Sequence, residues 1–278
     1  MQANQLLLMV PLSMTMKYFK RSFCFTAAVF CFKAQANICD VEVAAAPKPD
    51  NTHYVCDQHN KAFFGYDTSI NQPTFAIYNV RPHAFDGYIK NTGTYPPVPG
   101  LDQSKQPIYA MDNVVDKAYL VAPYQLITNE RYASSAFAMN NIIPIDKSVW
   151  RGKLRDILFD IDLLERDMKS NKGSVTALYG AIGGKVNKGP THLYRVYYQD
   201  KYKLTLSFSA FLVPISSELK SNIGSYITSI DCIEKLGKID LFPSIPLKEQ
   251  NDLENRKASS TVTWARLDGM AGGTTCNF

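Results

Sequence analysis

The clearest pattern along the chain is an apolar stripe with helical spacing between Val149 and Ser170. Charged residues fill most of the positions between the apolar ones, so the segment is amphipathic. A helix that buries one face against a core is predicted for this segment. The stripe consists of Leu154, Ile157, Leu158, Ile161, Leu164 and Met168.

Strand-like segments precede this helix. Residues 53–67 and 73–80 are dominated by aromatic and β-branched side chains, with Asn, Gly and Asp between them. This composition is typical of a strand, a turn and a second strand. Residues 81–107 are rich in Pro, Gly, Tyr and Asn and show no period, so a long surface loop is predicted there.

More strand-like segments follow the helix. Residues 174–184 indicate a buried strand that ends in a glycine turn, and residues 191–200 and 203–214 indicate two further strands. Residues 226–237 predict a strand running into a short helix closed by Gly237. Strands grouped around one or two helices favour an α+β fold with an antiparallel sheet flanked by helices, rather than alternating βαβ units.

The first 36 residues predict a secretory signal peptide. Basic residues precede an apolar run from Ser22 to Phe32, and Ala34 to Ala36 has the small-x-small pattern that signal peptidase cuts. A membrane anchor is the alternative, but this run of 11 residues is shorter than the ~20 that a spanning helix needs. We therefore expect cleavage after Ala36 and a secreted or periplasmic protein without a membrane attachment. Met16 offers a second translation start, and the sequence leaves that choice open.

Removing this leader changes the charge of the chain. The leader holds four of the 30 basic residues and none of the 25 acidic ones, so 26 basic residues face 25 acidic residues in the remainder. A net charge of +1 gives no general support for nucleic-acid binding, although it leaves room for a local basic patch. The hydrophobic share of 46% is ordinary for a globular protein and excludes overall disorder.

Four cysteines remain after the leader: Cys39, Cys56, Cys232 and Cys276. An even number in an exported chain favours two disulfides, for which three connectivities exist. The short separations favour pairing within the two terminal pairs, Cys39 with Cys56 and Cys232 with Cys276. No C-x-x-C or Cys/His spacing is present, which argues against a zinc site.

Three ordered segments resemble one known family. Residues 190–196 (PTHLYRV), 208–214 (FSAFLVP) and 229–246 (SIDCIEKLGKIDLFPSIP) are similar to scaffold motifs of the DNA/RNA non-specific endonucleases. This ββα-metal, or His-Me finger, family is typified by the Serratia nuclease and mitochondrial endonuclease G. The resemblance spans roughly Tyr54 to Pro246. It implies a nuclease-like domain over residues 54–265, after the signal peptide at 1–36 and a lead-in at 37–53, with a tail at 266–278.

The segment DKAYLVAP, residues 116–123, falls where that family has Asp-Arg-Gly-His-Leu. Asp116 matches, Lys117 replaces the arginine conservatively, and Tyr119 takes the place of the catalytic histidine. The resemblance implies a reaction in which the histidine removes a proton from water while one Mg²⁺ stabilises the developing charge. A tyrosine with a pKa near 10 stays protonated at pH 7, and the loss of a general base costs about 10²- to 10⁴-fold in rate.

The metal-binding part of the family pattern is also altered. Residues 136–144 (AFAMNNIIP) resemble a strand segment in which Asn141 matches a position assigned to substrate binding. Counting back from Trp150 places Asp146 where the family has the asparagine that binds Mg²⁺. Mg²⁺ is therefore expected only if the protein is active.

Other residues are candidates for the missing groups. His83, in the predicted loop, is the candidate substitute base, and the alternative is an ordinary loop histidine. Arg81 is a candidate phosphate-binding residue. Asp156 lies one helical turn from Asp160, and the two carboxylates are either a cation site or a solvated acidic face.

Three functional hypotheses follow from these residues. The first is an exported, degenerate nuclease-like protein with hydrolysis lost or weak, whose cleft is retained for DNA, RNA or another ligand. The second is an active Mg²⁺-dependent endonuclease with relocated ligands, namely Asp116, His83 and Asp156. The third is an unrelated adhesion or structural domain. No feature of the sequence identifies a protein partner.

Overall fold

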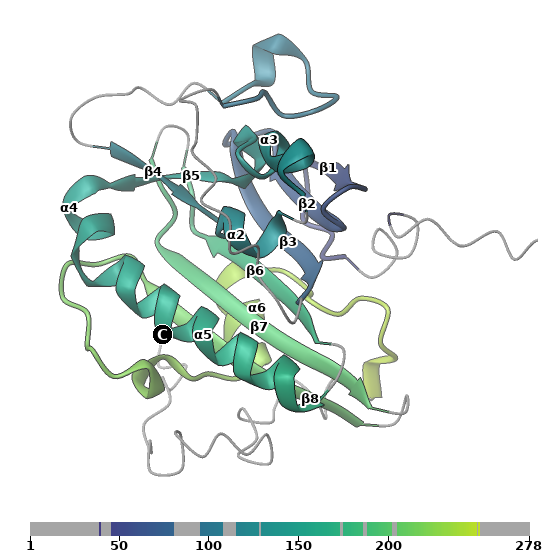
Figure 1. Cartoon of the computed structure of the whole chain (residues 1–278), viewed down its shortest axis with the longest axis vertical. Helices are drawn as coiled ribbons and strands as arrows, with labels where there is room; N and C mark the ends of the chain where they lie inside the picture. The colour runs from purple at the N-terminus through teal and green to yellow at the C-terminus, as the bar shows by residue number, and fades with distance from the viewer. Residues whose placement is uncertain are drawn as a thin grey trace, which may run out of the picture. The chain divides into compact units, whose positions relative to one another are not determined.

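A six-stranded antiparallel sheet forms the centre of the fold (Figure 1). The computed structural model describes residues 39, 46–80, 95–107, 115–127, 129–172, 175–185, 188–201, 205–248 and 250, and for 164–172, 199–201 and 205–208 only the backbone. The order across the sheet is β1-β2-β3-β6-β7-β8, and every neighbouring pair is antiparallel. The strands are β1 (Thr52–Asp57), β2 (Ala62–Asp67), β3 (Gln72–Asn79), β6 (Thr176–Ile182), β7 (His192–Lys201) and β8 (Thr205–Pro214).

Both faces of this sheet are buried, because side chains alternate along each strand. In β7, Leu193 and Tyr197 belong to the core on one face, while Tyr194 and Val196 belong to the core on the other face. Two hydrophobic cores therefore share one sheet.

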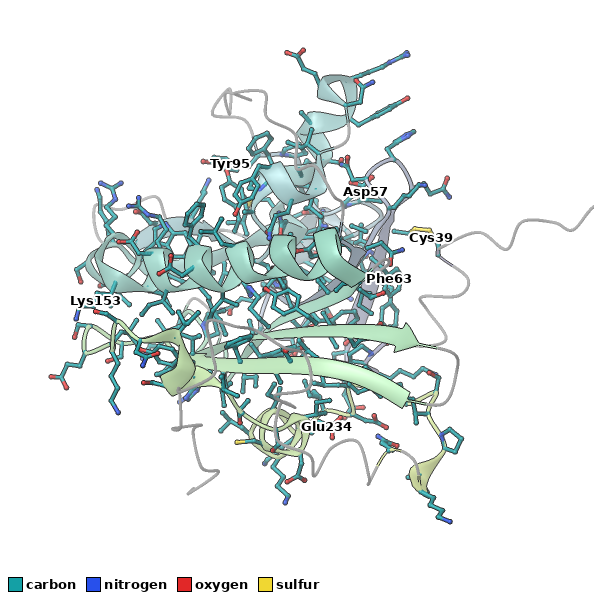
Figure 2. The ribbon with its side chains drawn as sticks, turned by 60° about the horizontal axis from the view of Figure 1, so that its bottom comes forward. Cys39, Asp57, Phe63, Tyr95, Lys153 and Glu234 are labelled. Carbon is teal, nitrogen blue, oxygen red and sulfur yellow. A yellow bond between two sulfur atoms is a disulfide. The ribbon has the colours of Figure 1, made fainter. Side chains whose placement is uncertain are left out.

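Helices α5 (Arg155–Lys172) and α6 (Ile230–Gly237) cover the opposite faces. Figure 2 shows the sheet between them, with Glu234 on the α6 side. Ile157 and Ile161 of α5 pack into one core, and Ile230 and Ile233 of α6 pack into the other. This arrangement confirms the predicted α+β class with an antiparallel sheet flanked by helices.

The long connection from β3 to β6 carries most of the remaining elements. Its two ends meet where the Val80 amide donates to the Val175 carbonyl at 2.8 Å, beside a hydrogen bond of 3.0 Å from Thr176 to Asn79. The connection holds η1 (Gln103–Lys105), β4 (Val115–Tyr119), α2 (Pro123–Leu126), η2 (Glu130–Tyr132), α3 (Ala133–Ala136), η3 (Met139–Asn141), β5 (Ile142–Asp146), α4 (Lys147–Val149), η4 (Trp150–Leu154) and α5.

The predicted helix is present, but it starts later than expected. Gly152 has non-helical angles (φ −79°, ψ −139°) and breaks the chain between α4 and α5, so the regular helix begins at Arg155 rather than at Val149. Of the apolar stripe, Leu154, Ile157, Leu158 and Ile161 are buried as predicted, while the side chains of Leu164 and Met168 lie outside the description.

Other boundaries also differ from the sequence-based expectation. Residues 53–67 form a hairpin of two strands, because the Asp57 side chain accepts hydrogen bonds from the His59 and Asn60 amides and closes a turn. The strand predicted at the start of residues 226–237 is absent from the described residues 215–229, where Ile227 makes only an isolated bridge to Phe211. Lys238, rather than a glycine, closes α6 in the left-handed conformation (φ 51°).

The disulfide between Cys39 and Cys56 confirms one predicted pairing. Cys232 is also disulfide-bonded. Cys276 lies outside the described residues, so the second pairing stays a prediction. The predicted signal peptide, residues 81–94 of the predicted loop and the predicted tail also lie outside them. Within the described part of the chain, no helix has the length and apolar character needed to cross a membrane.

A buried ion pair joins α5 to the sheet. Asp162 of α5 and Arg195 of β7 are both almost fully buried, with 3.6 Å between Oδ1 and Nε. The Tyr179 hydroxyl donates to the Asp162 carboxylate at 2.8 Å, and the Arg195 guanidinium lies 3.8 Å from the centre of the Tyr179 ring. Burial raises the pKa of Asp162, and the charge of Arg195 opposes that effect. Burial alone would lower the pKa of Arg195, but the Asp162 carboxylate and the hydroxyls of Tyr179, Tyr197 and Tyr78 together outweigh burial, and the pKa is raised.

We predict that Asp162→Ala lowers the free energy of unfolding by about 3–5 kcal/mol, because it leaves the Arg195 charge buried without its partner. Urea denaturation followed by circular dichroism measures this change. Asp160→Ala, at an exposed position of the same helix, is the matched control and should change the free energy by less than about 0.5 kcal/mol. A loss below about 1 kcal/mol in Asp162→Ala would show that the pair does not hold the helix.

Candidate active site

Two antiparallel strands and a helix form the unit where the catalytic residues were expected. β4 pairs with β5, so that Tyr119 lies opposite Ile142 and Asp116 lies opposite Ile145. The short α4, the irregular turn η4 and then α5 follow β5 directly. Figure 1 shows the β4–β5 pair beside α4, at the end of α5. The segment from α2 to η3 separates β4 and β5 along the chain, but the two strands pair in space and the helix follows β5.

The β6–β7 turn anchors this unit to the main sheet. A Cβ on Gly189 would approach the Pro144 carbonyl oxygen to 2.1 Å, which no side chain can do. The glycine therefore lets the backbone of the β6–β7 turn pack directly against the backbone of β5.

Tyr119 occupies the last position of β4. Its ring is partly buried and packs edge-on against Phe137, with 5.9 Å between the ring centres. This contact fixes the direction of the side chain that stands at the expected position of the base.

Asp116 forms a two-point ion pair with Arg151, a residue of η4 that the sequence reasoning did not single out. Arg151 Nε donates to Asp116 Oδ2 at 2.6 Å, and Nη2 donates to Oδ1 at 3.1 Å. Both oxygens of the carboxylate are thus engaged by one guanidinium. Arg151 is largely exposed and Asp116 is half-buried, so the pair contributes at most about 1 kcal/mol to stability.

Lys117 points to an aromatic ring. Its Nζ lies 3.6 Å from the centre of the Tyr95 ring, a cation–π contact between β4 and the loop before η1. Partial burial lowers the pKa of Lys117. Tyr95 is a second site residue that the sequence reasoning missed, because nothing in a loop without periodicity indicates which ring will meet β4.

Asn141 is fully buried and holds the turn after β4. Its Oδ1 accepts from the Val121 amide at 2.8 Å, and its Nδ2 donates to the carbonyls of Val121 and Ala136 at 2.8 and 2.9 Å. The main-chain carbonyl of Asn141 accepts from the Leu120 amide at 2.8 Å. These contacts give Asn141 a positioning role in the core, whereas the sequence analysis assigned it to substrate binding.

The two proposed metal ligands make local contacts. Asp146 caps α4 by accepting from the Ser148 side chain and amide and from the Val149 amide. These hydrogen bonds, with the Ser148 hydroxyl first, lower the pKa of Asp146. Asp156 is exposed and lies 3.5 Å from the guanidinium of Arg155.

The described carboxylates do not form a ready-made cluster of metal ligands. The three candidate carboxylates, Asp116, Asp146 and Asp156, are each engaged with a neighbouring side chain or amide. No group of three or more His, Cys, Asp or Glu residues that could hold a metal occurs within the described parts of the chain. Mg²⁺ usually keeps several waters and needs only one or two protein ligands, so its binding stays a prediction.

The expected substitute base, His83, and the candidate phosphate-binding residue, Arg81, lie outside the described residues. Three other histidines are described. His53 is hydrogen-bonded to the Pro99 carbonyl at 2.9 Å, and His59 stacks on Tyr132 with 4.0 Å between ring centres. His192 lies 3.0 Å from the Thr191 hydroxyl at the start of β7, and burial lowers its pKa.

The comparisons with known proteins support the nuclease-like fold. One chain of the crystal structure of the EndoG/EndoGI complex is similar to this chain, with a TM-score of 0.58 and 13% sequence identity. That structure describes the mechanism of EndoG inhibition. The match covers 81% of this chain and 98% of that chain. No family model matches the sequence, and no curated protein matches it. At 13% identity, this structural match shows a shared fold and nothing more. The match confirms the predicted endonuclease-G-like fold.

We predict that Asn141→Ala lowers the free energy of unfolding by about 3 kcal/mol, because it leaves buried main-chain groups of Val121 and Ala136 without partners. Asn140→Ala is the matched control. The Oδ1 of Asn140 is buried and has no hydrogen-bond partner, so the loss there should stay below about 1 kcal/mol. Urea denaturation of both variants tests this, and equal losses would contradict the positioning role of Asn141.

Proposed function

We propose that the chain is an exported, degenerate nuclease-like protein. It retains the endonuclease-G-like fold and hydrolyses phosphodiesters weakly or not at all. The former catalytic surface contacts nucleic acid without cutting it. The observation that carries this proposal is Tyr119, which stands at the end of β4 where the resemblance places the catalytic histidine.

The chemistry of Tyr119 supports the loss of hydrolysis. A phenol with an ordinary pKa near 10 is a poor base at pH 7 unless a cation lies beside it. Its ring packs edge-on against Phe137. The nearest basic residue in sequence, Lys117, points instead to the ring of Tyr95.

The carboxylates give further support. Arg151 neutralises Asp116, and Asp146 is used to cap α4. A nuclease of this kind needs a cation to stabilise the charge that develops on the phosphate. Within the described part of the chain, no group of three or more His, Cys, Asp or Glu residues stands ready to hold that cation.

A basic segment supports contact with phosphate groups. Residues 147–155 contain four basic side chains, all exposed or partly exposed, and no acidic one; Arg151 pairs with Asp116 and Arg155 lies beside Asp156. Arginine and lysine on an exposed surface bind nucleic-acid backbones through charge, independently of sequence. The basic residues are Lys147, Arg151, Lys153 and Arg155.

Export is the remaining part of the proposal. The disulfide between Cys39 and Cys56 is consistent with an oxidising compartment, in which such bonds persist. The predicted signal peptide would direct the chain there.

We predict that the chain without residues 1–36 does not nick plasmid DNA in the presence of Mg²⁺, and that Tyr119→His remains inactive. The single substitution supplies a base, but Asp146 does not supply the neutral amide ligand that the family uses. Agarose-gel assays with and without EDTA measure this, with an active member of the family as the positive control. Strong nicking by Tyr119→His would contradict the argument.

The active alternative makes the opposite prediction in the same assay. If the wild-type chain nicks DNA in an EDTA-sensitive way and His83→Ala abolishes the nicking, His83 is a relocated base. The proposal of a degenerate, inactive nuclease would then be wrong.

We also predict salt-dependent binding to nucleic acid. If phosphates are contacted, a mobility-shift assay should show a steep loss of affinity between ~50 and ~200 mM salt. Neutralising Lys147 and Arg155 with glutamine should reduce the slope of log K against log salt by about 1 per residue. Lys248→Gln, at an exposed position after α6, is the matched control. Absence of binding at the lower salt would remove nucleic acid as the ligand.

A further inference from the structure

The ion pair between Asp116 and Arg151 uses only one side of the guanidinium. Asp116 accepts from Nε and Nη2, at 2.6 and 3.1 Å. A guanidinium has five N–H groups, so three remain, and two of these lie parallel on the edge formed by Nη1 and Nη2. Within the described part of the chain Arg151 makes no further hydrogen bond, and its side chain is 59% exposed. The remaining donors are therefore available to a ligand.

A phosphodiester fits this open edge. Its two non-bridging oxygens can accept the two parallel N–H groups, and such two-point contacts add direction to the attraction of charge. A lysine ammonium is a point charge and lacks this geometry. A guanidinium that is already held in one orientation also loses less rotamer freedom when a phosphate binds.

Asp116 is well placed to hold the guanidinium. It lies in β4 opposite Ile145 of β5, and its side chain is 21% exposed. Arg151 lies in η4, immediately before Gly152, where the backbone leaves helical angles. The contact thus joins a paired strand to an irregular turn 35 residues away, and the strand supplies the more fixed partner.

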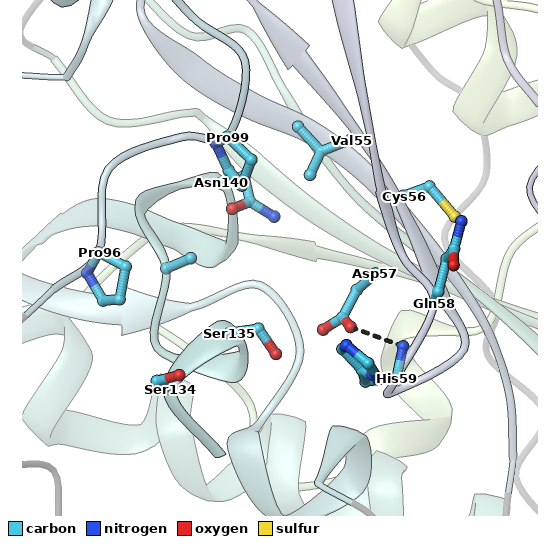
Figure 3. A pocket seen from close by; sticks show the side chains of 11 residues that line it. Val55, Cys56, Asp57, Gln58, His59, Pro96, Pro99, Ser134, Ser135 and Asn140 are labelled. Atoms are coloured by element: carbon cyan, nitrogen blue, oxygen red, sulfur yellow. Dashed lines mark hydrogen bonds between the residues drawn. The ribbon is translucent and has the colours of Figure 1, made fainter. Parts of the chain in front are cut away.

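Asp57, on the wall of the pocket drawn in Figure 3, shows the contrasting case. Its Oδ1 accepts from the main-chain amides of His59 and Asn60, both at 3.1 Å, so this carboxylate closes its own turn. Asp146 caps α4 in a similar local way. Asp116 differs from both, because its two oxygens are directed at one cationic side chain.

The other basic side chains of residues 147–155 are placed differently. Lys153 Nζ donates to the Leu219 carbonyl at 3.1 Å and so holds the segment after β8. Arg155 meets Asp156 through a single contact of 3.5 Å between exposed side chains. A guanidinium held through two hydrogen bonds occurs in this segment at Arg151.

We propose that Arg151 is a preoriented phosphate-binding residue and that Asp116 is the positioning residue that holds it. The Nη1–Nη2 edge donates two hydrogen bonds to one phosphodiester of a nucleic acid, while Asp116 keeps the Nε–Nη2 side. The assignment rests on the proposed contact with nucleic acid and adds which residue makes the directed contact. It gives Asp116 a role in binding that does not require hydrolysis.

The sign of one substitution tests this assignment. Asp116→Asn removes a negative charge from a surface that binds a polyanion, so charge alone would tighten binding. If Asp116 orients Arg151, Asp116→Asn should instead weaken binding by about fivefold, which is the upper range for an exposed ion pair. Fluorescence anisotropy with a short labelled DNA duplex at ~50 mM salt measures the affinity. Asp160→Asn, at an exposed position of α5, is the matched control and should not weaken binding.

Substitutions of Arg151 show whether Asp116 acts through it. Arg151→Lys keeps the charge without the two-sided guanidinium, so it should weaken binding by about fivefold and leave the salt slope unchanged. When Asp116→Asn is added to Arg151→Gln, it should no longer weaken binding. Because an exposed pair contributes little to stability, each variant should unfold at a urea concentration close to that of the wild type.

Two kinds of failure are distinguishable. If the wild type binds in a salt-dependent way and Asp116→Asn binds as well or better, the pair has no positioning role, although nucleic-acid binding stands. The same holds if Asp116→Asn weakens binding equally in the Arg151→Gln background. Absence of binding by the wild type would overturn both the proposed function and the role of the pair.

Discussion

The ion pair of Asp162 and Arg195 fixes where α5 lies on the sheet, and the rest of the insertion depends on that position. Tyr179 and Tyr197, on neighbouring strands, donate hydrogen bonds to the same carboxylate oxygen. Gln125 of α2 donates to the Tyr179 hydroxyl at 3.2 Å and so joins the network from the segment just after β4. One buried charge pair thus connects two strands, the long helix and the turn that follows the candidate catalytic strand. Arg195 Nε makes no hydrogen bond to the carboxylate and acts on it through charge at 3.6 Å.

Structural contacts within the chain hold the shape of the strand–strand–helix unit. The Asn141 side chain stabilises the turn after β4 by hydrogen bonds to the main-chain amide and carbonyl of Val121. Asp146 caps α4. Both roles are structural, and neither needs a metal ion or a substrate. The side chain at position 119 can therefore change while the backbone around it stays the same. Function resides in the site rather than in the fold, and this unit separates the two.

The sequence predicted the fold better than it predicted the site. Alternating strands and the stripe from Leu154 to Ile161 depend on local periodicity, which a sequence displays directly. The start of α5 at Arg155 was missed because a single glycine, Gly152, breaks the helix inside an otherwise helical pattern. The ion pair between Asp116 and Arg151 joins residues 35 positions apart, so no local pattern indicates it. Asn141 was matched by motif, but its burial became evident only from the packing of α3 and β4.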